Sequence, residues 1–314
     1  MTVPFRISKL ANFEGLSDAK LDAYLNRIDV SRADVSNKDL TSLNRVLDGH
    51  SRKIAFENGL LFFTDEKIES GSDAAFEHIV ERGRGGYCFQ VNTLLLSALS
   101  GLGFDATPGV ARSCVWDSDS QSWLYGPTTH MVVFVALPDS LYLADMGFNQ
   151  RGLSVAIRIE DGATVSCAAA EAHEIRSSDV TGEGNWMLWH KRAEWAPRAD
   201  GVDPNGDGFY PMFYFTLERY RPEDYQVLNY FVCHSMRHVM MRTFIASIVT
   251  ETGGRAVIVD KTFKRREDEN HRELERIVLM SSVEDLVYIM AQQFGIVMTE
   301  QEIVGAEQKL FSSV

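Results

Sequence analysis

The sequence predicts an α+β protein in which a helical bundle, a small antiparallel β-barrel or sandwich, and a mixed α/β region follow one another. The 314 residues allow two or three structural units with a sizeable core. Apolar residues recur at helical spacing as far as Gly103, and short runs rich in Val, Phe and Tyr follow it. We therefore expect domains at residues 1–103, 104–211 and 212–314.

The first hundred residues carry several amphipathic segments. Their spacing predicts helices over 18–28 and 38–54, and a shorter one over 73–80. The apolar run from Val91 to Leu99 predicts a buried helix with Cys88 in its first turn. Together these segments predict the helical bundle.

Short strands separated by turn residues dominate the middle of the chain, and the last third mixes strands with helices. In the middle, strands are predicted over 111–116, 130–137, 141–145, 155–159 and 186–190. In the last third, strands are predicted over 212–217, 243–249, 256–263 and 276–280, and a helix over 283–294. A capping box, Thr299-Glu300-Gln301-Glu302, opens a final helix.

Composition excludes several classes of protein. The net charge of −13 argues against a nucleic-acid binder, because neutralising phosphates requires a basic face. The N-terminus lacks the apolar core of a signal peptide, and no apolar run approaches the length of a membrane span. We expect a cytoplasmic protein with no membrane partner.

Metal binding and disulfides are not expected. The four cysteines are scattered without a Cys-x-x-Cys pair, at Cys88, Cys114, Cys167 and Cys233. The segment Asp203-Pro204-Asn205-Gly206-Asp207-Gly208 imitates the start of a calcium loop, but Tyr214 stands where that loop requires glutamate.

Cys88 is the candidate nucleophile. Gly85 and Gly86 precede it, so the chain can turn tightly and another molecule can approach the sulfur. Free backbone N–H groups in the first turn of a helix favour a thiolate. The alternative is a free cysteine that serves as a small apolar filler.

A cysteine nucleophile needs a base, and the base needs an orienting partner. His130 begins one predicted strand and Asp145 ends the next, so a hairpin would bring them together. The alternative is an edge histidine and an unrelated turn aspartate. Two other histidines, His173 and His190, have no acidic residue at a suggestive spacing. We therefore predict a Cys88–His130–Asp145 triad.

These motifs resemble the arylamine N-acetyltransferase family. Its hallmark Arg-Gly-Gly-x-Cys is matched by residues 84–88, followed by His130 and by Asp145-Met146-Gly147-Phe148. Phe56-Glu57-Asn58 resembles a further family element, and the resemblance extends over nearly the whole chain. It implies a helical bundle, a β-barrel and a C-terminal α/β lid around a cysteine-protease-like core.

The resemblance also implies a reaction. Cys88 would take an acyl group from acyl-coenzyme A, acetyl-CoA or malonyl-CoA, and pass it to an arylamine, hydrazine or arylhydroxylamine in a ping-pong sequence. Such chemistry belongs to xenobiotic metabolism, with coenzyme A as cosubstrate and no metal, in a monomer or weak homo-oligomer. His130 would hold the thiol proton, and Asp145 would orient the imidazole.

Further site residues are implied in the same way. Glu57 and Arg84 would form a buried pair that fixes the Cys88 loop, the alternative being a surface pair worth about 0–1 kcal/mol. Phe148 would contact the acceptor ring, or else only pack in the core. The remaining substrate contacts, to coenzyme A, would come from Gly126, Thr129 and Ser235.

The segment Met236-Arg237-His238 replaces the Pro-x-Ser usual in the lid. Arg237 could pair with an anionic group, which is the basis for a malonyl donor. Two other readings stay open: an amide synthase or thioester hydrolase that uses the same triad, and a non-catalytic binding protein. The intact triad argues against the last.

Overall fold

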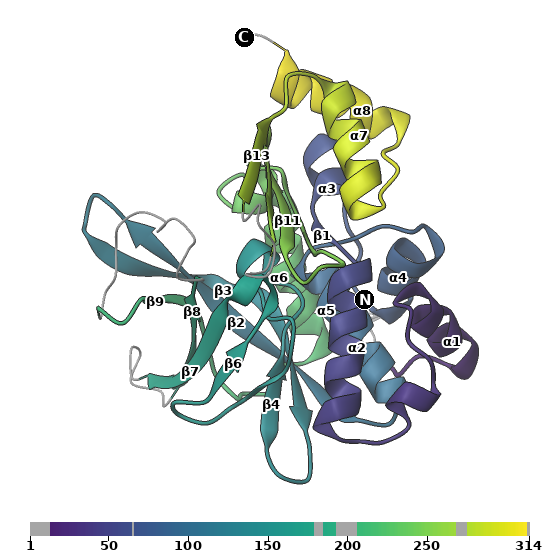
Figure 1. Cartoon of the computed structure of the whole chain (residues 1–314), viewed down its shortest axis with the longest axis vertical. Coiled ribbons are helices and arrows are strands. Elements are labelled where there is room, and N and C mark those ends of the chain that lie inside the picture. The colour runs from purple at the N-terminus through teal and green to yellow at the C-terminus, as the bar shows by residue number, and fades with distance from the viewer. Residues whose placement is uncertain (1–12, 65, 179–184, 193–205, 268–274, 313–314) are drawn as a thin grey trace, which may run out of the picture.

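A helical bundle, a curled antiparallel sheet and a second sheet with two helices make up the computed structural model (Figure 1). It describes residues 13–64, 66–178, 185–192, 206–267 and 275–312. Residues 203–205 of the calcium-like segment lie outside these ranges.

The helical bundle surrounds one buried helix. It consists of α1 (Asp18–Arg27), α2 (Leu40–Lys53), α4 (Ser72–Phe76) and α5 (Cys88–Gly101), whereas the short helix α3 (Gly59–Phe63) packs against the C-terminal helix over residues 300–306. Every residue of α5 from Cys88 to Leu99 is buried, as expected for a helix that is apolar on all sides. The predicted helix therefore forms, and it begins at Cys88.

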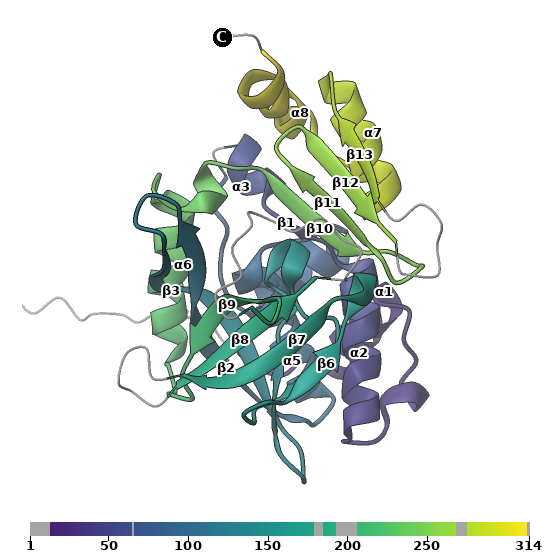
Figure 2. The same ribbon diagram turned by 60° about the vertical axis from the view of Figure 1, so that its left-hand side comes forward.

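Eight antiparallel strands curl into a nearly closed barrel, in the order β5-β4-β3-β2-β9-β8-β7-β6 (Figure 2). Their bounds are β2 (Asp105–Asp117), β3 (Ser122–Ala136), β4 (Leu141–Ala144), β5 (Ile157–Arg158), β6 (Thr164–Ser166), β7 (Ala172–Ser178), β8 (Asn185–Lys191) and β9 (Phe209–Phe215). Strand β9 crosses the expected boundary between 211 and 212 and pairs with β2 and β8.

The second sheet joins one early strand to four strands from the last third of the chain. Its order is β1-β10-β11-β12-β13, with β1 (Phe56–Glu57), β10 (Ile245–Val249), β11 (Arg255–Val259), β12 (Thr262–Arg266) and β13 (Glu275–Leu279). α6 (Pro222–His234) precedes this sheet, and α7 (Val283–Phe294) and α8 (Glu300–Ala306) follow it. Since β1 comes from the helical region, the first domain contributes a strand to the last.

The prediction of a single strand over 256–263 is wrong. The chain turns at Asp260, whose φ of 49° lies in the left-handed region, so β11 and β12 form a hairpin. The apolar residues on both sides of this short turn resemble one continuous strand in the sequence.

Candidate active site

The loop before Cys88 lies directly on strand β1. The Gly86 N–H donates to the Ala55 carbonyl at 3.1 Å, and the Glu57 N–H donates to the Gly86 carbonyl at 3.0 Å. A Cβ atom at Gly85 would lie 2.2 Å from the Ala55 oxygen. Glycine is therefore required for this close approach, and the contact fixes the start of α5.

His130 and Asp145 meet as the predicted hairpin requires. His130 Nε2 donates to Asp145 Oδ2 at 2.7 Å, and both side chains are buried. Because Nε2 is used here, Nδ1 is the nitrogen left for the Cys88 thiol. The contact with Cys88 is one of the interactions that raise the pKa of His130.

Burial alone would lower the pKa of His130. The Asp145 carboxylate and the Cys88 sulfur outweigh it, and together they raise that pKa to about 10. At neutral pH the ring is therefore held as an imidazolium beside the thiol. The Cys88 sulfur also lies 3.8 Å from the Thr129 carbonyl oxygen.

Asp145 has further hydrogen bonds that keep it in place. Its Oδ1 accepts from the Gly147 N–H at 2.8 Å and from Asn92 Nδ2 at 2.8 Å. With the His130 bond, the buried carboxylate accepts from three donors, as an ionised group in the interior requires.

Asn92 is a site residue that the sequence reasoning missed. It lies one helical turn after Cys88, donates to the Met131 carbonyl at 2.7 Å and accepts from the Met146 N–H at 2.9 Å. One side chain on α5 thus holds both β3 and the segment after β4. Its spacing of four from Cys88, which places both on one face of a helix, was the available signal.

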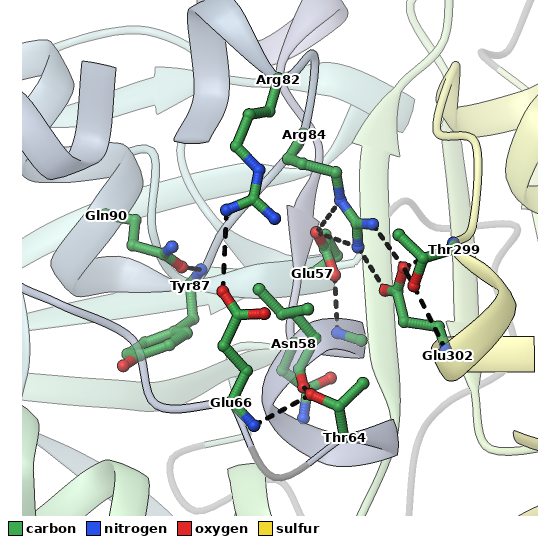
Figure 3. Close-up of polar contacts among 12 residues, drawn as sticks. Glu57, Asn58, Thr64, Glu66, Arg82, Arg84, Tyr87, Gln90, Thr299 and Glu302 are labelled. Atoms are coloured by element: carbon green, nitrogen blue, oxygen red, sulfur yellow. Dashed lines mark hydrogen bonds and ion pairs between the residues drawn. The ribbon is translucent and has the colours of Figure 1, made fainter. Parts of the chain in front are cut away.

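Arg84 binds two carboxylates (Figure 3). The expected partner Glu57 accepts at 3.1 Å, and Glu302 of α8 accepts from both terminal nitrogens at 2.7 and 2.6 Å. All three side chains are at most 6% exposed, so this is a buried cluster and not a surface pair.

Glu302 was predicted only as part of a capping box. It fills that role as well, because its carboxylate accepts from the Thr299 N–H at 2.9 Å while its own N–H donates to Thr299 Oγ1 at 3.2 Å. The same carboxylate therefore caps the start of α8 and holds the loop that precedes Cys88.

The expected substrate-binding residues do not all lie next to Cys88 and His130. Phe148 is half-buried, and its ring centroid lies 5.0 Å from those of His130 and of Phe213, a neighbour that the sequence reasoning missed. The Gly126 carbonyl accepts from Arg112 at 3.3 Å. Ser235 caps the end of α6, away from any described contact with Cys88 or His130.

Comparison with known proteins defines the class. Residues 39–303 match the family model described as N-acetyltransferase, which covers more than half of the chain. The arylamine N-acetyltransferase 1 of Rattus norvegicus is 27% identical over 251 residues, 78% of this chain and 83% of the relative. The arylamine N-acetyltransferase of Mycolicibacterium smegmatis is 32% identical over 179 residues, 56% of this chain and 62% of the relative.

Solved structures share the fold of this chain. The arylamine N-acetyltransferase of Mycobacterium abscessus has a TM-score of 0.77 at 22% identity, covering 92% of this chain and 94% of that one. That of Mycobacterium marinum in complex with CoA has a TM-score of 0.76 at 22% identity, covering 93% and 100%. The fold and the family match thus define a transferase. The chain belongs to the arylamine N-acetyltransferase family.

The resemblance predicted from the sequence is therefore confirmed, as is the α+β fold with its helical bundle and barrel. No helix in the described part of the chain has the length and apolar character that a bilayer crossing requires. Within the same residues, no group of three His, Cys, Asp or Glu side chains is arranged to hold a metal ion.

Proposed function

We propose that the chain transfers an acetyl group from acetyl-CoA to an arylamine through an acyl-Cys88 intermediate. The observation that carries the proposal is the position of Cys88. It begins helix α5 and lies beside the His130 imidazole, which the buried Asp145 carboxylate holds. A thiolate and an imidazolium supply the nucleophile and the acid that acyl transfer needs.

In the first half-reaction, Cys88 Sγ attacks the thioester carbonyl carbon. The carbon–sulfur bond to coenzyme A breaks, and His130 gives its proton to the departing thiolate. In the second, the amine nitrogen attacks the acyl-cysteine while His130 takes one of its protons. The amide leaves and the Cys88–His130 ion pair is restored. Asp145 keeps the imidazole oriented in both steps.

Intact-protein mass spectrometry after addition of acetyl-CoA tests this route. We expect one acetyl group, on the peptide that contains Cys88, and no acetyl group in Cys88→Ser. Adding an aromatic amine should then discharge the adduct and yield the acetylated amine. Acylation of a residue other than Cys88 would contradict the proposal.

The same experiment separates the alternatives that use the same triad. A thioester hydrolase would lose the acyl group to water at the same rate with or without the amine. An amide synthase that uses a carrier protein would form no adduct from acetyl-CoA. Either result would overturn the acetyltransferase assignment.

Malonyl-CoA is the alternative donor, and Arg237 is its basis. This side chain is exposed in the segment that follows α6, where it could pair with a carboxylate. Single-turnover acylation by acetyl-CoA and malonyl-CoA is the test. If Arg237→Ala leaves the ratio of the two rates unchanged, the argument for malonyl transfer is lost.

A further inference from the structure

A second cysteine and a second histidine lie together far from Cys88 in the chain. Cys167 follows β6, and its N–H donates to the Glu171 carbonyl at 2.7 Å, which continues the β6–β7 hairpin. Val165 lies opposite His173 in this hairpin. Because alternate residues of a strand share a face, Cys167 lies on the same face as His173, as its diagonal neighbour.

His173 is in the tautomer whose Nδ1 can accept a proton. Its Nε2 is 2.8 Å from the Arg151 carbonyl oxygen. A carbonyl only accepts, so Nε2 carries the proton and Nδ1 of the neutral ring has a free lone pair. The ring is fully buried, and Nδ1 makes no hydrogen bond to any described nitrogen or oxygen. A thiol is the donor that its diagonal neighbour offers.

The charges around the pair favour a thiolate. Burial would raise the pKa of Cys167, but the His173 ring, a Ser154 N–H and the Arg255 charge lower it to about 7. Arg255 and Arg266 of the second sheet bind the buried Glu171 carboxylate at 2.9 and 3.0 Å.

His190, which stands opposite His173, lies 3.5 Å from the same Glu171 carboxylate. The spacing of acidic residues along the sequence did not indicate this neighbour of His190, because Glu171 comes from the turn before the neighbouring strand and not from a recognisable motif.

We infer that Cys167 is a second reactive thiol, which forms a mixed disulfide with low-molecular-weight disulfides. Cys167 packs against the barrel core but is itself only partly buried, which leaves part of the residue accessible to a small reagent. Its thiolate attacks one sulfur of the disulfide, a new S–S bond forms, and the old one breaks. The expelled thiolate takes the proton held by His173.

The other cysteines supply a matched comparison within the same molecule. Cys114 is partly exposed like Cys167, but burial raises its pKa to about 12, and no histidine contributes to that pKa. Cys233 is buried, and this burial raises its pKa as well. Of the two, Cys114 is the better control because, like Cys167, it is partly exposed.

The test uses the full chain carrying Cys88→Ser, so that it does not depend on the proposed acyl transfer. The protein is treated with oxidised glutathione at pH 7, and its peptides are quantified by mass spectrometry. We expect glutathione on the Cys167 peptide at a rate more than about tenfold above that of the Cys114 peptide. Equal rates at the two cysteines would overturn the inference.

Two further measurements test the role of the His173 imidazole and the selectivity of Cys167 for disulfides. His173→Gln should lower the Cys167 rate about tenfold or more while leaving Cys114 unchanged, with folding checked by thermal unfolding. An unchanged Cys167 rate in the folded variant would contradict the role of the imidazole. Rapid labelling by iodoacetamide without reaction with oxidised glutathione would contradict the assignment to disulfides.

Discussion

The Cys88 and Cys167 regions are built from the same kinds of side chain, but their charges are arranged in opposite ways. Beside Cys88, one arginine, Arg84, lies between two carboxylates. Beside Cys167, one carboxylate, Glu171, lies between two arginines. Both clusters are buried, and both join an earlier part of the chain to its last third.

The two regions differ in the group that accepts the hydrogen bond from each imidazole. The His130 ring donates to the Asp145 carboxylate, whereas the His173 ring donates to a backbone carbonyl. Only the first can stabilise an imidazolium by an ion pair along that hydrogen bond. In both proposals the imidazole holds the proton of the thiol, but only the His130 ring is paired with a carboxylate while it does so.

Removing the Asp145 charge next to His130 should have the largest effect of the three changes, and it acts on the rate of acylation. Asp145→Asn makes the Cys88 pair resemble the Cys167 pair, and we expect acylation by acetyl-CoA to slow roughly a thousand- to ten-thousandfold. Rapid-quench measurement of acyl-Cys88 would show it. Asp139→Asn, at the exposed turn of the same hairpin, is the control and should leave the rate within about twofold. If Asp145→Asn acylated Cys88 at a rate close to that of the wild-type protein, the carboxylate would not distinguish the Cys88 pair from the Cys167 pair.

Removing the central charge of the Cys88 cluster should have the next largest effect. Arg84→Ala leaves two carboxylates buried without a cation, so we expect the free energy of unfolding to fall by about 3–5 kcal/mol. Urea unfolding measures this. Arg82→Ala, in the same loop, breaks a half-exposed pair with Glu66 at 3.6 Å and should cost about 0–1 kcal/mol (Figure 3). Equal losses would mean that burial does not distinguish the two arginines.

The smallest of the three effects concerns how closely the chain approaches Cys88. A Cβ atom at Gly147 would lie 2.7 Å from Cys88 Cα and 2.7 Å from Asn92 Nδ2. We therefore expect Gly147→Ala to slow acylation about 10- to 100-fold by displacing the thiol. Gly152→Ala meets nothing closer than 3.4 Å and is the matched control. If both variants acylate at the wild-type rate, the packing against Cys88 is not critical.

Much of the fold could be predicted because it is encoded locally. The buried helix after Cys88 and the strands that carry His130 and Asp145 follow from residue spacing and turns within short windows. The hairpin even gave the correct neighbour for His130. The roles of these residues in catalysis stay predictions, as do the coenzyme contacts of Gly126, Thr129 and Ser235.

What could not be predicted depends on contacts between distant segments. Glu302 contacts Arg84 across 218 positions, and no local pattern links them. The spacing of Asn92 places it on the same helix face as Cys88, but its partners on β3 and after β4 become evident only in the folded chain. The turn at Asp260 was missed because a single residue at positive φ carries it.

The Arg84–Glu302 contact also sets an order of events during synthesis. Ribosomes add about 5–20 residues per second, so roughly 10–45 s separate the appearance of Arg84 from that of Glu302. Of the two carboxylates that bind Arg84 in the folded chain, only Glu57 has been synthesised during that interval. The loop before Cys88 therefore gains its second carboxylate partner only after Glu302 has been synthesised.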